Sequence, residues 1–419
     1  MQSWRSYLKW LKPGLGVKRW LLLLVLGIGL LSLGIAIALR ALYPLPQFFY
    51  FLTLQFLPRG LRASLVLLVG IWAIIYGFRG LYRAILEPFL VGAAQSVPEV
   101  IYDYRHRGRG PKIVVMGGGN GQAASLRGLK AFSSNLTAIV TVADDGGSSG
   151  RLRRDIGILP PGDFRNCIAA LADDESLVTR LFRYRFAGGQ DLRGHSFGNL
   201  FITAMAGVTG SFESALRESS EVLAVQGQVL PSTLKTVTLC ADIACKDSTP
   251  VRVCGESEIP KVNGRILRVT LEPANPSAYP GAIQAILAAE LIVIGPGSLY
   301  TSLLPNLLVP EIVEALKAAP APKVYVCNAA TQRGETDHYT AEAHVNALEQ
   351  HLGKGVIDIV LVNSQIPRGI SFGDGIEWVK PDIVGHGSQR VVYADLLDET
   401  QAGRHDSHKL ARELRAMLK

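Results

Sequence analysis

The chain has two kinds of hydrophobic pattern: long uncharged runs near the N-terminus, and short apolar runs separated by helical patterns further on. The first long run, residues 20–39, contains no charged residue, and Arg40 follows it. A transmembrane helix needs about 20 apolar residues to cross a hydrocarbon core of roughly 30 Å. The second run, residues 63–78, reaches that length only when its borders are included. The pattern therefore predicts two transmembrane helices, at about residues 20–40 and 61–80.

A cleaved signal peptide is the alternative interpretation of the first run. The run is longer than the usual apolar core of about 7–15 residues, and no small-x-small cleavage site follows it before Tyr43. Lys and Arg residues flank the pair of runs on its outer sides, which favours placing both termini in the cytoplasm. We therefore expect a membrane hairpin over residues 1–82 in a multi-pass protein of the inner or plasma membrane, with the main domain cytoplasmic.

After a predicted linker at residues 83–111, short apolar runs alternate with helical patterns. This alternation is typical of a parallel sheet covered on both faces, whose ligands bind beyond the carboxyl ends of the strands. Residues 227–271 instead alternate every second residue, as antiparallel strands do. The prediction for residues 112–419 is an α/β domain with a mainly parallel sheet and a small antiparallel extension. We expect strands at 112–116, 136–142, 291–294, 324–327 and 357–362, and helices at 121–130, 310–319, 341–351 and 407–418.

The net charge of +8 does not indicate nucleic-acid binding. Residues 1–111 carry 13 Lys and Arg against 3 Asp and Glu, a net charge of +10, which leaves −2 for residues 112–419. The basic excess lies in the predicted membrane region, where it would face anionic lipid headgroups. No basic stripe interleaved with aromatic residues remains. The five cysteines include no C-x-x-C pair, so we expect reduced, buried thiols.

The densest group of small and polar residues is A-D-D-G-G-S-S-G-R-L-R-R at residues 143–154, directly after a predicted strand. Asp144 and Asp145 could accept hydrogen bonds from a sugar hydroxyl or hold Mg²⁺ through oxygen ligands. A role in capping or in a turn is the alternative for either residue. The run also offers hydroxyl and guanidinium donors to a phosphate, from Ser148, Ser149 and Arg151. Together these residues indicate a site for a phosphorylated ligand.

A glycine-rich loop follows the first strand of the predicted α/β domain. Glycines let the backbone approach a phosphate, and the amides of a helix N-terminus favour an anion. Gln122 stands where the last glycine of the dinucleotide fingerprint would fall, and the Lys-Ser/Thr pair of a P-loop is absent. A tight strand-to-helix turn is therefore the alternative. The loop consists of Gly117, Gly118, Gly119, Asn120 and Gly121.

Four further motifs contain small and polar residues, at 160–166, 194–199, 295–302 and 331–336. Asp163 is also a candidate N-cap, and His195 could be a general base or a packing histidine. No second histidine lies at metal-ligand spacing, which argues against zinc, and no nucleophile has an obvious partner, so catalytic residues stay unknown. We expect these motifs to line one cleft, with ligand contacts from Asp163, Arg165, Asn166, His195, Asn199, Gly297, Ser298 and Gln332.

The order of these motifs closely resembles the YvcK family, often labelled gluconeogenesis factors, which are relatives of the 2-phospho-L-lactate transferase CofD. The matching segments are G-G-G-N-G, V-A-D-D-G-G-S-S-G-R-L-R, P-P-G-D-F-R-N-C, G-H-S-F-G-N-L, G-P-G-S-L-Y-T-S-L-L-P-N and T-Q-R-G-E-T. The resemblance covers residues 112–419 and implies a Rossmann-like three-layer domain. It also implies that Arg404, in the stretch R-H-D, reaches the ligand together with the residues named above.

The resemblance further implies binding of a UDP-sugar, notably UDP-N-acetylglucosamine, with no required cofactor. Family members similar to this chain are associated with gluconeogenic growth, cell shape and envelope synthesis. The chain departs from the family pattern at Asn120, Ala330 and Arg333, and it matches poorly over residues 372–380. These departures affect the contacts that would select the sugar more than those to phosphate.

Two functions are compatible with the sequence. The first is a membrane-tethered cytoplasmic regulator that binds a UDP-sugar, because the predicted cleft has many phosphate and hydroxyl partners but no convincing catalytic pair. The second is a CofD-like, Mg²⁺-dependent transferase of a phospholactyl-type group, which the paired aspartates favour. A nicotinamide oxidoreductase is disfavoured because the fingerprint fails at Gln122. Expected partners are the nucleotide-sugar, the membrane through residues 20–80, envelope or metabolic regulatory proteins and a second copy of the chain, but no nucleic acid.

Overall fold

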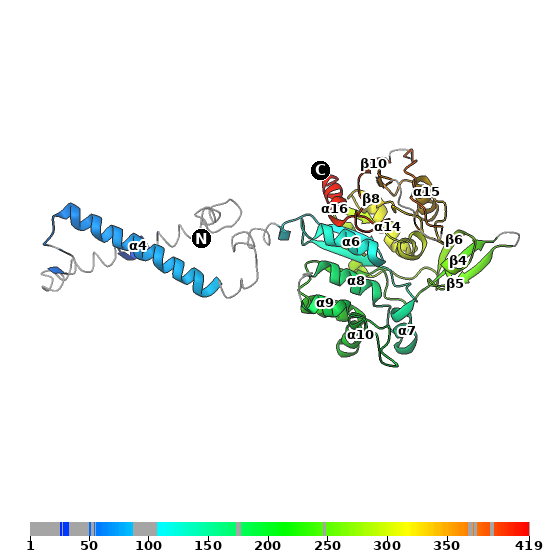
Figure 1. Cartoon of the computed structure of the whole chain (residues 1–419), viewed down its shortest axis with the longest axis horizontal. Coiled ribbons are helices and arrows are strands. Elements are labelled where there is room, and N and C mark those ends of the chain that lie inside the picture. The colour runs from blue at the N-terminus through cyan, green and yellow to red at the C-terminus, as the bar shows by residue number, and fades with distance from the viewer. Residues whose placement is uncertain are drawn as a thin grey trace. The chain divides into compact units, whose positions relative to one another are not determined.

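The computed structural model describes residues 26, 28–32, 50–51, 54, 56–86, 107–172, 177–245, 249–367, 372, 375–385 and 389–418. The chain separates into two compact units, Met1–His106 and Arg107–Lys419. The first unit contains the helix α4 (Arg59–Leu86). The second contains the sheets and the remaining labelled helices (Figure 1).

The prediction of a multi-pass membrane protein is wrong. Among the described residues, no helix is both long enough and apolar enough to cross a membrane. The second expected span, residues 61–80, falls within α4. A span requires about 20 apolar residues, and the uncharged sequence between Arg62 and Arg79 is shorter than that. Most of the first expected span, residues 20–40, lies outside the described part of the chain.

A seven-stranded parallel sheet forms the centre of the second unit, with the order β10-β9-β8-β7-β1-β2-β3. From β1 the chain proceeds to β2 and β3 on one side, and later from β7 to β10 on the other. The direction of winding therefore reverses between β1 and β7, which is where ligands of such sheets bind. The strands are β1 (Ile113–Gly117), β2 (Leu136–Val140), β3 (Gln228–Pro231), β7 (Leu291–Ile294), β8 (Lys323–Val326), β9 (Ile359–Asn363) and β10 (Arg390–Ala394).

Helices cover both faces of this sheet, because right-handed crossovers in opposite directions place α6 and α14 on opposite faces. α6 packs against α8 and α16, and α12 packs against α14. The helices are α6 (Gly119–Leu129), α7 (Gly147–Ile156), α8 (Gly162–Leu171), α9 (Leu177–Arg183), α10 (Phe197–Thr209), α11 (Phe212–Val222), α12 (Pro280–Leu287), η4 (Leu299–Leu303), α13 (Leu304–Leu307), α14 (Pro310–Ala318), α15 (Ala341–Leu352) and α16 (Ser407–Ala416).

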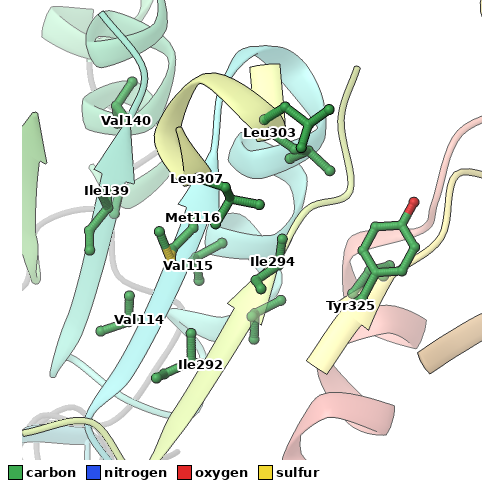
Figure 2. Close-up of a cluster of buried hydrophobic side chains, with 14 of the residues drawn as sticks. Val114, Val115, Met116, Ile139, Val140, Ile292, Ile294, Leu303, Leu307 and Tyr325 are labelled. Atoms are coloured by element: carbon green, nitrogen blue, oxygen red, sulfur yellow. The ribbon is translucent and has the colours of Figure 1, made fainter. Parts of the chain in front are cut away.

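The core lies around β1, the central strand at the reversal. Every residue of β1, β2 and β7 is buried, as expected for strands covered on both faces. Side chains of β1 lie between those of its two neighbours, which are in register with it, and leucines of η4 and α13 join the same cluster (Figure 2). Each fully buried aliphatic side chain contributes about 1.5–3 kcal/mol. This packing holds the carboxyl ends of the strands, where the candidate motifs begin, in a fixed arrangement.

A second sheet of three antiparallel strands projects from the body of this unit (Figure 1). Its strands are β4 (Thr238–Ala244), β5 (Val251–Cys254) and β6 (Arg265–Glu272), and we call it the antiparallel arm. The mainly parallel α/β fold with a small antiparallel extension is therefore confirmed. Cys240 on β4 lies opposite Cys254 on β5, and a disulfide links them. The expectation of reduced thiols is wrong for this pair, because strand pairing brings together two cysteines that sequence spacing does not relate.

Candidate functional site

A cleft of about 730 Å³ lies where the parallel strands end, which places it at the predicted edge of the sheet. This volume is in the range of small-molecule sites, about 300–1,000 Å³. Of the residues that the sequence predicted, the cleft is lined by Gly118, Gly119, Asn120, Gly121, Asp144, Asp163, Gly297, Ser298, Gln332 and Arg404. Segments separated by up to several hundred residues thus contribute to one site.

The glycine loop forms one wall. Gly119 has a φ of +64°, a left-handed conformation that glycine adopts without strain, and the N-cap Gly118 provides no side chain to cap α6. A methyl group on Gly118 would lie 2.6 Å from Asp163 Oδ2, so the loop and this carboxyl group are in close contact. The Gln122 side chain donates hydrogen bonds to the carbonyls of Val115 and Ile139, at 2.8 and 2.9 Å. The residue that breaks the dinucleotide fingerprint therefore ties β1 to β2.

Acidic side chains gather at one end of the cleft. A methyl group on Gly146 would lie 3.5 Å from Asp144 Oδ1 and 3.9 Å from Glu256 Oε2, so both carboxyl groups border the same space. Burial, and then the nearby Asp144, raises the pKa of Asp163 to about 7. Burial also raises the pKa of Asp144, although the Gly146 amide donates to its Oδ1 at 2.9 Å. Clusters of perturbed carboxyl groups in a cleft are typical of functional sites. We call Asp144, Asp163 and Glu256 the acidic end.

Asp145 does not line the cleft with its neighbour. Its Oδ1 accepts a hydrogen bond from the Ser257 amide at 2.9 Å, which ties it to the antiparallel arm. Glu256, the residue before Ser257, lines the cleft instead, although it is not among the predicted site residues. The available signal was a Gly-Glu-Ser run directly after the end of a strand, the same arrangement that drew attention to Asp144.

The opposite wall comes from the loops after β7 and β8. Gln332 Nε2 donates to Ser298 Oγ at 2.6 Å. The Gly297 amide donates to Asn328 Oδ1 at 3.1 Å, and Asn328 Nδ2 donates back to the Gly297 carbonyl at 2.9 Å. Because Ser298 accepts from Gln332, its own hydroxyl proton is available to a ligand. The predicted residues of these two loops are thus brought together, as expected of neighbouring strand ends.

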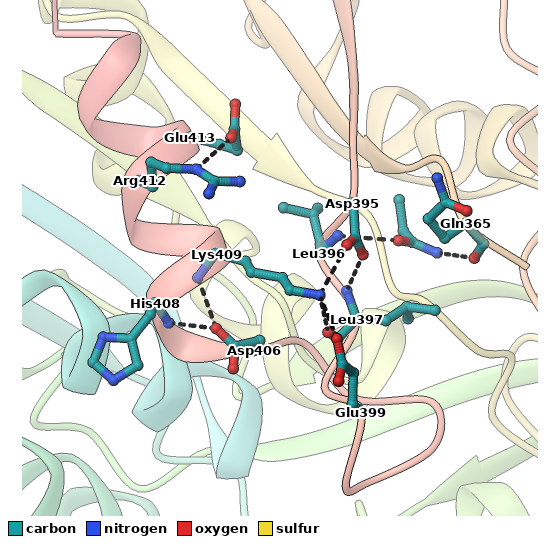
Figure 3. Close-up of polar contacts among 11 residues, drawn as sticks. Gln365, Asp395, Leu396, Leu397, Glu399, Asp406, His408, Lys409, Arg412 and Glu413 are labelled. Carbon is teal, nitrogen blue, oxygen red and sulfur yellow. Dashed lines mark hydrogen bonds and ion pairs between the residues drawn. The ribbon is translucent and has the colours of Figure 1, made fainter. Parts of the chain in front are cut away.

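The loop of residues 395–406 closes the other end of the cleft. Lys409 on α16 holds it by donating to Asp395 Oδ2 at 2.8 Å and to the Leu397 carbonyl at 3.1 Å (Figure 3). Asp406 caps α16 by accepting from the amides of His408 and Lys409, at 2.9 and 2.7 Å. These contacts fix the ends of the loop whose middle lines the cleft.

This loop and α6 make a basic end. Arg404 and Arg127 both line the cleft there, and Arg404 Nη1 donates to Gln401 Oε1 at 2.8 Å. His405 also lines it, is 8% exposed, and has an Nε2 with no hydrogen-bond partner in the structure. Burial lowers the pKa of His405 to about 4, so the ring is neutral at pH 7. Asp398 of the same loop also lines the cleft near Arg404, so the two arginines at this end are accompanied by one acid.

The remaining predicted residues lie outside this lining. His195 Nδ1 is 2.9 Å from Ser148 Oγ, and Asn199 Nδ2 donates to the same oxygen at 3.0 Å. All three side chains are buried, so they join α7 to α10. Burial, and then Arg151, lowers the pKa of His195. The structure places the following predicted residues behind or beside the cleft: Gly117, Asp145, Ser148, Ser149, Arg151, Arg165, Asn166, His195 and Asn199.

Several of these residues have structural partners of their own. Ser149 Oγ accepts from the Gly162 amide at 3.1 Å, which links α7 to the start of α8. Arg151 Nη2 donates to the Arg193 carbonyl at 2.8 Å. Arg165 Nη2 donates to Asn166 Oδ1 at 2.6 Å, and burial lowers the pKa of this arginine. These contacts hold α7, which follows Asp144 in the chain, and α8, which carries Asp163.

Comparison with known proteins places this site in a family. The family model for the 2-phospho-L-lactate transferase CofD matches residues 113–390. A Nostoc sp. (strain PCC 7120) protein is 47% identical over 98% of this chain and 92% of its own length. The gluconeogenesis factor of Bacillus subtilis (strain 168) is 50% identical over 74% of this chain and 99% of its own length. A crystal structure of a UPF0052 family protein from Bacillus halodurans has a TM-score of 0.67 and 43% identity, covering 73% of this chain and 99% of that one. The chain therefore belongs to the CofD family, together with the gluconeogenesis factors.

Proposed function

We propose that this protein binds a UDP-sugar, with UDP-N-acetylglucosamine as the first candidate, and acts as a gluconeogenesis factor that regulates gluconeogenic growth, cell shape and envelope synthesis. The names of its relatives support a gluconeogenesis-related role. The observation that carries the choice of ligand is the cleft itself, which combines an open helix N-terminus, an acidic end and a basic end.

Each part of this ligand class has a matching chemical partner. The N-cap residue Gly118 gives α6 no side-chain cap. The Gly119 amide bonds the Asp163 carboxyl group, which leaves the other amides of the first turn for a diphosphate. Arg127 and Arg404 can pair with phosphate oxygens. Carboxyl groups after the second strand of a doubly wound sheet bind sugar hydroxyls, which suits Asp144 and its neighbours. A ligand with anionic phosphates and hydroxyl-rich rings fits both ends at once.

Binding without turnover is the activity that this cleft supports best. The Ser148–His195 pair is the arrangement most like a nucleophile and its base, and it does not line the cleft. Ser148 accepts from Asn199, so its own proton points to His195 in a buried network that holds two helices together. We therefore propose a regulator that changes its interactions with other proteins on binding the sugar nucleotide.

A CofD-like transferase is the second candidate, and the acidic end is the observation that favours it. The carboxylate oxygens of Asp144 and Asp163 are suitable ligands for Mg²⁺, whereas Asp145 is held by the Ser257 amide. A bound Mg²⁺ would neutralise charge on the phosphates. We therefore propose Asp144 and Asp163 as the Mg²⁺ ligands, in place of the expected Asp144 and Asp145.

Titration calorimetry of the full chain with UDP-N-acetylglucosamine, with and without Mg²⁺, tests the proposal. We expect saturable binding, weakened about tenfold by Arg404→Ala, since a charge-assisted hydrogen bond contributes about 1.5 kcal/mol. Arg412→Ala is the matched control, because Arg412 is an exposed arginine on α16 that pairs with Glu413 (Figure 3). No binding at millimolar ligand would sink the proposal, and equal affinities of the two variants would remove Arg404 from the site.

A further inference from the structure

Glu256 enters the cleft from an element outside the parallel sheet. It follows β5 in the antiparallel arm, one residue after Gly255, whose φ of +113° suits glycine. The Gly255 amide donates to the Leu239 carbonyl at 2.8 Å, and the disulfide links the preceding Cys254 to Cys240. The chain just before Glu256 is therefore attached to β4 by one hydrogen bond and one covalent bond.

Asp145 fixes the other side of this turn. Its Oδ1 accepts from the Ser257 amide at 2.9 Å. A methyl group on Gly255 would lie 2.9 Å from Asp145 Oδ2, so this carboxylate lies against the turn on both sides of Glu256. Asp145 thus acts as a positioning residue, which explains why two adjacent aspartates follow the same strand.

The Glu256 carboxyl group has no structural role that would account for this placement. Among the described residues, it forms no hydrogen bond and no ion pair, while its side chain lines the cleft beside Asp144. The Glu256 side chain is partly exposed to the cleft, so its carboxyl group is open to a partner from outside the chain. The nearest charged groups of the neighbouring elements are acids, which leaves a hydroxyl group as a suitable partner.

We propose that Glu256 is a ligand-binding residue, which hydrogen-bonds a hydroxyl group of the bound sugar. This inference rests on the proposed function and extends it to a residue that comes from outside the parallel sheet. The antiparallel arm then serves to deliver one side chain into the cleft, and its attachment to β4 and to Asp145 sets the position of that side chain.

The surroundings of Glu256 also set its protonation. Burial raises its pKa to about 8, and so do the facing carboxyl groups of Asp144, Glu335, Asp145 and Asp163. At pH 7 the group is then mostly neutral and can both donate to and accept from a hydroxyl. A bound ligand would remove the remaining water and disfavour the ionised form further.

Calorimetry of the full chain with UDP-N-acetylglucosamine at pH 7 tests this inference. We expect Glu256→Ala to weaken binding about tenfold, the size of one lost hydrogen bond. Glu256→Gln should stay within about threefold of wild type, because an amide also donates and accepts.

Glu258→Gln is the matched control. Glu258 lies two residues further in the same turn, is exposed, and pairs with Lys261 at 2.6 Å. Melting temperatures of all variants report whether they fold. The inference is overturned if Glu256→Ala binds as tightly as Glu258→Gln, or if Glu256→Gln weakens binding as much as Glu256→Ala does. Failure of the wild-type chain to bind the ligand would overturn the proposed function as well, so the two failures differ.

Discussion

Gly121→Ala should separate the two loops that form the cleft. Gly121 lies in the first turn of α6, and an added methyl group would be 2.3 Å from the Pro296 carbonyl oxygen and 3.1 Å from the Gly297 nitrogen. Cβ atoms essentially never approach other heavy atoms within 3.0 Å, so the contact is 0.7 Å too short. Both obstacles are backbone atoms, which no side-chain rotation can relieve. The loop after β7 and the start of α6 must therefore move apart.

The magnitude follows from two opposing effects. Overpacking a tightly packed contact costs about 1–3 kcal/mol, and a backbone obstacle favours the upper part of that range. Alanine in place of glycine within a helix gains about 0.5–1 kcal/mol. We therefore expect a net loss of about 2 kcal/mol, which lowers the Tm by about 5 °C in a protein of this size. Because Pro296 and Gly297 line the cleft, ligand affinity should fall too.

Thermal unfolding and ligand titration of Gly121→Ala check this prediction against Gly207→Ala. Gly207 is an exposed glycine within α10, and an added methyl group there would meet nothing within 4 Å. This control should keep or slightly raise the Tm, because it gains helix propensity without a clash. The reasoning is refuted if Gly121→Ala is as stable as Gly207→Ala and binds the ligand as wild type does.

Three further predictions concern the arm and the acids. Reducing the Cys240–Cys254 disulfide, which spans 14 residues, should lower the free energy of unfolding by about 3 kcal/mol in urea titrations, and equal midpoints before and after reduction would contradict this. Burial raises the pKa of Glu335 from 4.5 to about 7, so its stabilising neutral form is complete below pH 4.5 and is lost as the pH rises through 7. Unfolding measured from pH 4.5 to 7.5 should therefore show a smaller loss of stability for Glu335→Gln, and parallel curves would count against it. Asp145→Ala removes the acceptor of the Ser257 amide and should weaken ligand binding in calorimetry. Unchanged affinity would show that the turn does not depend on Asp145.

The elements that sequence predicted best are the buried ones. The expected strand at 291–294 coincides with β7, and the other four expected strands all lie on β1, β2, β8 and β9. Central strands buried on both faces produce continuous apolar runs, which are easy to recognise. The apolar pattern predicts no strand at β10 and assigns β3 to the antiparallel extension. Both are edge strands with partly exposed residues, so their sequences carry little of that signal.

Much of the cleft could also be predicted, because strand ends in a parallel sheet meet at one edge. Asp144, Ser298, Gln332 and the glycines at 118–121 all line the cleft after strand ends, as expected. Asp163 reaches it instead from the start of α8. His195 does not line the cleft. It lies between α9 and α10, not directly after a strand, and its side chain packs against Ser148. The motif pattern contains no information on which side of a helix each polar side chain will face.

The sequence by itself determined that a glycine loop and a pair of aspartates follow two neighbouring strands, and that the family's motifs occur in order. Only the tertiary structure decided that Asp144 borders the cleft while Asp145 turns to Ser257, which is 112 residues away. The two carboxylates part because Asp145 binds a backbone amide of the antiparallel arm, a partner that spacing along the chain does not reveal. Glu256 joins Asp144 and Asp163 at the acidic end because the antiparallel arm packs beside them.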